Sequence, residues 1–100
     1  MSLETATDKL RARLPEFRAL DAKVRFVIED EGSILIDATA APPALSHDDD
    51  NAVCTVRLSE EKLDKLLTGE LSPTLAYTLG QIKVEGSLGV AMKLASLLES

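Results

Sequence analysis

The densest group of potential metal ligands is His47, followed directly by Asp48, Asp49 and Asp50. Hard cations such as calcium need several oxygen ligands in a fixed geometry, and a calcium-binding loop places them at alternate positions around a turn glycine. Here the acids are consecutive and no glycine stands among them. We therefore interpret the run as a solvated acidic loop and expect no metal site.

The residues of a nucleophilic enzyme are also missing. A serine or cysteine nucleophile needs an adjacent base, but His47 is the only histidine and no nucleophile-elbow motif is present. A reactive thiolate needs a nearby cation or helix N-terminus, whereas Cys54 lies midway along an apolar, strand-like stretch. We interpret Cys54 as a core residue that could also line a cavity. The segment 86–89 lacks the lysine of a phosphate-binding loop. We expect no catalytic residue, no cofactor and no enzymatic activity.

Two other side chains could meet a small ligand. Tyr77, the only tyrosine, either packs into the core or presents its hydroxyl group at the boundary of an apolar site. Met92 fills core space by default, but methionine also adapts to ligands of different shape. The sequence leaves both alternatives open for each residue.

Composition narrows the class of protein. The chain has 100 residues, which we expect to form one domain over residues 1–100; 45% are hydrophobic and 3% aromatic. The formal net charge of −6 disfavours nucleic acid and anionic membranes as partners, because both attract basic surfaces. A single cysteine excludes an internal disulfide and fits a reducing compartment.

Targeting signals are absent from the sequence. No apolar run approaches the ~20 residues that a membrane-spanning helix needs, so we expect no stable membrane anchoring. The first ten residues do not form a signal peptide, and the last residues are not the peroxisomal Ser-Lys-Leu address. We expect a cytoplasmic protein, and a bacterial one.

The first half of the chain predicts one helix and a β-hairpin. Apolar residues at helical spacing predict a helix over residues 3–14, which Pro15 ends, with one further turn up to Leu20. Alternating apolar residues over 22–39, interrupted by a turn that contains Gly32, predict two antiparallel strands. Within them Val27 and Leu35 are apolar residues on the otherwise polar face, and the sequence leaves open whether a helix, a sheet edge or a partner subunit covers them.

The middle of the chain predicts a loop and then a strand. Residues 40–51 contain two adjacent prolines, so we expect at most an edge fragment around residues 44–46. Residues 52–58 alternate again and predict a strand. Ser59 is placed to cap a following helix, whose first turn is acidic.

Glycines and cap residues divide the last third into short elements. Gly69 ends the helix that follows Ser59, and Ser72-Pro73 begins a short one. Residues 81–85 form a half-buried strand between two glycines, and Ser87 caps a last helix. Its apolar residues repeat at helical spacing: Leu88, Ala91, Leu94, Ala95 and Leu98.

This last third resembles the lipid-binding domain of the sterol carrier protein type 2 (SCP-2) family. The family motifs are matched in order and without a gap by Gly69–Tyr77, by Gly80–Ser87 and by Ala91-Met92-Lys93-Leu94. Cys54 in its strand and the Leu-Leu-x-Gly end of the preceding helix extend the resemblance to roughly residues 22–98.

The resemblance implies an α+β fold: a mostly antiparallel sheet of about five strands, covered by helices on one face. It also implies an apolar tunnel between sheet and helices that holds a fatty acid, phospholipid, sterol or isoprenoid lipid. The candidate lipid-binding residues are the inward positions of the predicted elements: Leu10, Leu14, Phe17, Phe26, Ile28, Ile36, Cys54, Val56, Tyr77, Leu79, Ile82, Val84, Leu88, Met92 and Leu94. Lys83 and Lys93 also match the motif; we interpret them as exposed, with contact to a lipid head group as the alternative.

The predicted function is non-enzymatic lipid binding or transfer. The protein's acidity, and Gln81 where relatives often have lysine, argue against acyl-CoA esters as the ligand. One alternative is a structural module with a filled core that forms a homodimer, favoured by the outward-facing Val27, Leu35 and Val53. Another is an accessory factor that presents a lipid intermediate to biosynthetic enzymes.

Overall fold

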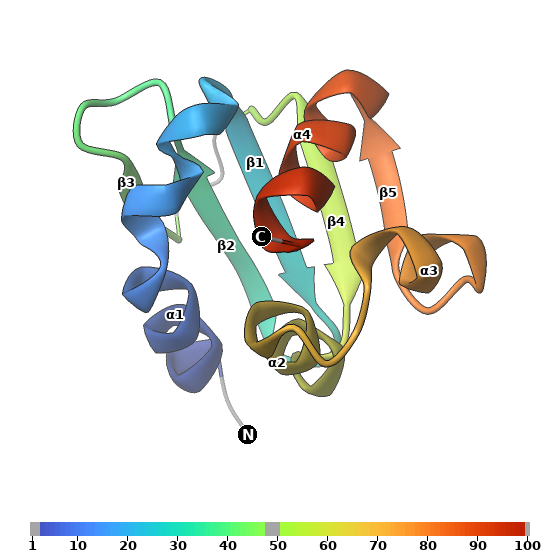
Figure 1. Ribbon diagram of the computed structural model, residues 1–100. Coiled ribbons are helices and arrows are strands. Elements are labelled where there is room, and N and C mark those ends of the chain that lie inside the picture. Colours follow the sequence, from blue (N-terminus) through green and yellow to red (C-terminus); the bar gives the residue numbers. More distant parts are fainter. Residues whose placement is uncertain (1–2, 48–50, 100) are drawn as a thin grey trace.

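The computed structural model describes residues 3–47 and 51–99, so the expectation for Asp48 to Asp50 lies outside the described residues. Its centre is a five-stranded sheet in the order β3-β2-β1-β4-β5 (Figure 1). The strands are β1 (Lys23–Ile28), β2 (Gly32–Asp37), β3 (Ala44–Ser46), β4 (Cys54–Leu58) and β5 (Lys83–Gly86). All neighbouring pairs are antiparallel except β1 and β4, which are parallel. The predicted α+β fold with a mostly antiparallel sheet is therefore confirmed.

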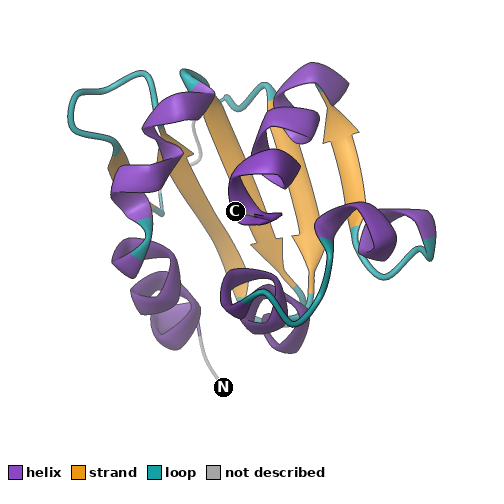
Figure 2. Ribbon diagram, viewed as in Figure 1, coloured by secondary structure: helices purple, strands orange, loops and turns teal. Residues whose placement is uncertain are grey.

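The helices lie over one face of this sheet (Figure 2). They are α1 (Leu3–Ala12), the 3-10 helix η1 (Leu14–Leu20), α2 (Glu60–Thr68), α3 (Pro73–Thr78) and α4 (Leu88–Glu99). In Figure 1, η1 lies in front of the β2–β3 side of the sheet, α4 runs from the upper end of β5 across the front of β4 and β1, and α3 lies beside the lower end of β5. Within the described part of the chain, none of these helices is long and apolar enough to cross a bilayer.

The helix ends follow the local chemistry that the sequence predicts. Ser59 caps α2, because its hydroxyl oxygen accepts a hydrogen bond from the Lys62 backbone N–H at 3.1 Å. Gly69 ends the same helix with φ at +85°, in the left-handed region that glycine tolerates best. Pro15 sits at the start of η1, so the chain changes helix type there instead of continuing α1.

Gly86 fixes how α4 begins next to β4. Its φ is +94°, and a β-carbon at this position would lie 2.3 Å from the backbone oxygen of Val53. The following N–H, of Ser87, donates a hydrogen bond of 2.7 Å to that same oxygen. Only glycine allows this close approach of the two backbones, and α4 leaves the sheet from this point.

The core lies between the sheet and its helices and is mainly aliphatic. On β1 the side chains of Val24, Phe26 and Ile28 are buried and alternate with partly exposed ones. The few aromatic rings pack together: the centroids of Phe17 on η1 and Phe26 are 6.3 Å apart. The half-buried strands that the period-two pattern predicted are therefore present.

Leu35 lies on the other face of the sheet, where the sequence left a helix, a sheet edge or a partner subunit as its cover. The dimerisation alternative needed it to stand outward with Val27 and Val53. Leu35 is instead only 4% exposed, and it lies in register between Arg25 on β1 and Ser46 on β3. The chain buries this leucine itself, because β3 adds an edge strand beside it. Val53 is the exposed member of the three.

Candidate lipid-binding pocket

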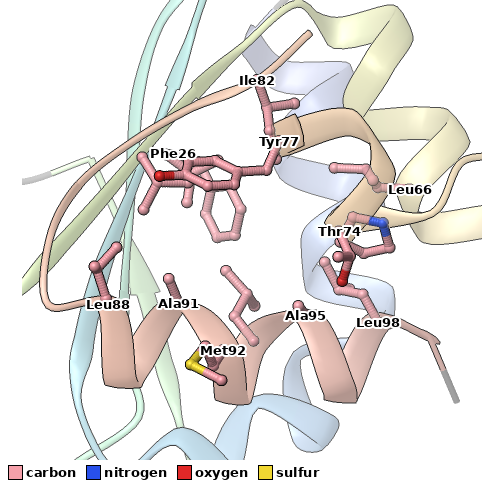
Figure 3. Close-up of a pocket in the computed structure, with 14 residues that line it drawn as sticks. Phe26, Leu66, Thr74, Tyr77, Ile82, Leu88, Ala91, Met92, Ala95 and Leu98 are labelled. Carbon is pink, nitrogen blue, oxygen red and sulfur yellow. The ribbon is translucent and has the colours of Figure 1, made fainter. Parts of the chain in front are cut away.

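An apolar pocket of about 150 Å³ lies between the β4–β5 side of the sheet and helices α3 and α4 (Figure 3). It is lined by Phe26, Val56, Leu66, Pro73, Thr74, Tyr77, Ile82, Val84, Leu88, Ala91, Met92, Leu94, Ala95 and Leu98. No charged side chain is among them. The pocket is therefore suited to a hydrocarbon group and not to an ion.

The sheet supplies one wall of the pocket as a single row of side chains. Phe26 on β1 is paired with Val56 on β4, and Val56 is paired with Val84 on β5. Directly paired residues in neighbouring strands point to the same face of a sheet. The parallel pairing of β1 with β4 therefore brings these three residues to one wall, although they are far apart in the chain.

Helix α4 supplies the opposite wall and leaves space in it. Leu88, Ala91 and Ala95 point from α4 toward the cavity, across from Phe26 and Tyr77 (Figure 3). Their spacing of three and four residues places them on one face of the helix. Two of the three are alanines, whose methyl groups leave unfilled the volume that leucine would occupy.

Helix α3 closes one side of the pocket. Ser72 caps it by accepting a hydrogen bond from the Leu75 N–H at 3.3 Å, and Pro73 occupies its first turn. Thr74 and Tyr77 then face the pocket three residues apart. The Tyr77 side chain is half exposed, and within the described residues its hydroxyl group has no hydrogen-bond partner. Of the two alternatives for Tyr77, the structure places it at the boundary of the apolar site.

The only thiol is not activated. Cys54 is buried in the core, and this burial raises the pKa of its thiol above the usual value. A raised pKa keeps the group protonated at neutral pH, which is the opposite of what a nucleophilic cysteine needs. Within the described residues there is also no cluster of three or more potential metal ligands.

The family model described as the SCP-2 sterol transfer family matches residues 3–99. The chain belongs to the SCP-2 family. The match covers α1 to α4, including every element that lines the pocket.

Known relatives agree with this assignment. Sterol carrier protein 2 of Rattus norvegicus is 40% identical over 67 residues, which are 67% of this chain. The match takes up only 10% of that protein, so the chain spans about a tenth of the length of such curated relatives.

Two solved structures share the fold at low sequence identity. The solution structure of sterol carrier protein 2 from Aedes aegypti in complex with palmitate has a TM-score of 0.71 at 20% identity, covering 98% of this chain and 96% of that one. The ubiquinone synthesis protein UbiJ-SCP2 has a TM-score of 0.73 at 18% identity, covering 96% and 91%.

The candidate lipid-binding residues predicted from the sequence of this SCP-2 family member fall into two groups, those that line the pocket and those that do not. Those that the structure places around the pocket are Phe26, Val56, Tyr77, Ile82, Val84, Leu88, Met92 and Leu94. Those that it does not place there are Leu10, Leu14, Phe17, Ile28, Ile36, Cys54 and Leu79.

These other candidates lie elsewhere for two reasons. Five are almost completely buried in parts of the core that do not border the pocket: Leu10, Phe17, Ile28, Ile36 and Cys54. Leu14 is partly buried beside this core and borders a separate surface groove. Leu79 ends α3 and is largely exposed. The sequence pattern shows that a side chain points into the core, but it does not show whether that part of the core is filled or contains a pocket.

The sequence reasoning missed several lining residues. They are Leu66, Pro73, Thr74, Ala91, Ala95 and Leu98. Ala91 and Ala95 had a usable signal, because they continue the helical repeat from Leu88, but small residues were not considered as walls of a cavity. Lys83 and Lys93 are exposed and do not line the pocket, as the sequence interpretation expected.

Proposed function

We propose that the protein binds the hydrocarbon part of a lipid in the pocket between the sheet, α3 and α4, and carries it without chemical change. The observation that supports this most is the lining itself: an uncharged, mostly aliphatic surface whose only hydroxyl groups are those of Thr74 and Tyr77. The palmitate named in the Aedes aegypti structure makes a fatty acid the first ligand to test. Burial of the chain supplies the affinity, at ~0.8 kcal/mol for each methylene group.

The size of the pocket limits how a lipid fits. Its volume of about 150 Å³ is comparable to that of a dry protein cavity that holds a single benzene molecule. A complete fatty acid needs more room, so we propose that the pocket widens on binding or that the rest of the chain leaves through the mouth. Met92 and Leu88 are the side chains to move, because they line the pocket and are largely exposed.

The proposal also covers the setting of this activity. We propose that residues 1–100 act as one lipid-binding domain with no enzymatic step of its own. The buried Cys54 thiol, whose pKa is raised by burial, supports the absence of covalent catalysis, and a single cysteine fits a reducing compartment such as the cytoplasm. The alternative of a dimerisation module is weakened, because Leu35 is buried by its own chain.

Native mass spectrometry of the purified protein, before and after organic extraction, tests the proposal. We expect an apolar adduct, and we expect the extracted protein to take up one palmitate. Ala91→Leu extends a side chain into the pocket and should weaken palmitate binding at least tenfold, whereas Ala12→Leu, at the exposed end of α1, should leave it unchanged. The proposal would be contradicted if the protein took up no palmitate, no phospholipid and no quinone. It would also be contradicted if the Ala91→Leu and Ala12→Leu proteins bound palmitate equally well.

A further inference from the structure

Large apolar side chains surround the mouth of the pocket and are open to solvent. Tyr77, Leu88 and Met92 both line the pocket and are at least half exposed; Met92 reaches 72%. We call these three residues the apolar rim. The outer side of α3 exposes two further leucines, Leu75 and Leu79. Nearly all the large apolar side chains that the described chain exposes are therefore on α3 and α4, with Val53 as the exception.

The charge of the protein is distributed unevenly around this rim. Residues 71–98, which form α3, β5 and most of α4, carry two lysines and one glutamate. The remaining positions carry nine basic and sixteen acidic side chains, a net charge of −7, whereas the segment itself carries +1. The single glutamate, Glu85, is neutralised by an ion pair with Arg57. Lys83 and Lys93 form no ion pair with any described residue.

We propose that the apolar rim docks transiently on the surface of a lipid bilayer, with the mouth of the pocket facing the acyl chains. This inference rests on the proposed function and names the surface from which the lipid is taken. Apolar side chains on a short helix enter the boundary between head groups and acyl chains, and nearby lysines favour the phosphate layer. The acidic remainder of the molecule is repelled from the same layer, which orients the pocket toward the bilayer.

A bilayer fits this surface better than a protein partner does. A lipid that moves between the pocket and a bilayer would otherwise expose its whole chain to water, and docking at the mouth removes that barrier. A protein bound to the rim would instead cover the exposed residues that border the pocket. The docking is also reversible, because a few partly inserted side chains supply far less apolar area than a membrane-spanning helix.

The chain contains no tryptophan, so Tyr77→Trp introduces a fluorescent reporter at the rim. The Tyr77→Trp protein is mixed with vesicles of phosphatidylcholine, either pure or containing one-fifth phosphatidylserine. Each vesicle type is also prepared with a brominated lipid that quenches tryptophan fluorescence. We expect a blue shift and quenching of the tryptophan emission. In this background Leu88→Gln with Met92→Gln should lower vesicle partitioning about tenfold, while Val27→Thr, on the opposite face of the sheet, should leave it unchanged.

Palmitate binding by the same proteins, measured in solution by native mass spectrometry, separates the two proposals. Palmitate uptake without a vesicle-dependent shift would overturn the docking and leave the carrier function standing. Vesicle binding that depends on the rim, without any uptake of lipid, would overturn the carrier function and leave the docking. Equal partitioning of the rim variant and its parent, or a dimer in sedimentation that the rim variant dissolves, would also overturn the docking.

Discussion

The two halves of the helical layer cover the same sheet in different ways. On one side α1 and η1 bury Leu10 and Phe17 in the core, and polar contacts attach this side to α2 and to His47. Arg13, which links the two helices, donates a hydrogen bond of 2.8 Å to the backbone oxygen of Leu67 on α2. Thr7 lies 2.9 Å from His47, and Lys9 lies 3.5 Å from the buried Glu60.

On the other side α3 and α4 retain a pocket and expose apolar residues. Thr78 on α3 donates a local hydrogen bond to the Thr74 backbone oxygen at 2.9 Å. We call α1 and η1 with the core residues that they bury the filled half, and α3 and α4 with the pocket the pocket half. One continuous core joins the two halves, and η1 lies against α4. The difference teaches that the pocket exists because Ala91 and Ala95 on α4 leave volume unfilled, and not because of any polar group.

Truncation of one large side chain on each side should give the largest contrast. Leu10→Ala removes a fully buried side chain of the filled half and should lower the free energy of unfolding by about 2–5 kcal/mol. Met92→Ala removes an exposed side chain of the pocket half and should change the free energy of unfolding by less than about 0.5 kcal/mol. Urea unfolding followed by circular dichroism measures both. Similar losses in the two variants would show that the pocket half is as tightly packed as the other.

The attachment of the pocket half to the sheet can be tested at Gly86. Gly86→Ala forces a β-carbon onto the Val53 carbonyl and a strained φ, so it should cost about 2–4 kcal/mol of stability. Gly89→Ala is the matched control, because a β-carbon there would lie at an ordinary contact distance of 3.8 Å from Ser87 Oγ, and alanine favours a helix by up to ~1 kcal/mol relative to glycine. Thermal unfolding of both proteins is the measurement. A neutral Gly86→Ala would mean that α4 does not depend on this close approach.

The tether at Arg13 should have a smaller effect. Arg13→Met keeps much of the side-chain volume but removes the hydrogen bond to Leu67 and the ion pair with Glu16, so we expect a loss of about 1 kcal/mol. Hydrogen exchange locates the effect: the amides of η1 and α1 should exchange faster, while those of α4 stay unchanged. Faster exchange of α4 alone would contradict the division into two halves.

The ion pair in the filled half should give the smallest effect, and one that depends on pH. A side-chain hydrogen bond from Arg13 lowers the pKa of Glu16 below its usual value of 4.5. A carboxyl group with a lowered folded-state pKa stabilises the protein above the usual pKa, and that contribution is lost as pH falls through the folded value. Glu16→Gln should therefore destabilise by under about 0.5 kcal/mol at pH 7, because the pair is exposed.

This deficit relative to the parent protein should disappear as the medium becomes more acidic than the usual carboxyl range. Parallel urea titrations of both proteins at pH 7 and pH 3 measure it. A deficit that grows in acid would show that Glu16 acts through some contact other than Arg13.

Local sequence determined the elements of this protein and their ends. Ser59, Ser72 and Gly69 specify caps through hydrogen bonds and backbone angles within a few residues, so those predictions needed no knowledge of the fold. The two-residue repeat likewise identified the buried face of β1. Family motifs then supplied the fold class.

Only the tertiary structure decided where the chain keeps a pocket. The parallel pairing that aligns Phe26, Val56 and Val84, and the position of Ala91 and Ala95 across from them, join residues distant in sequence. Leu10 and Phe17 have the same inward pattern as Leu88, yet they are packed in the filled half. Periodicity records that a side chain points inward, whereas a cavity depends on the summed volume of side chains from several elements, and that sum exists only after they pack.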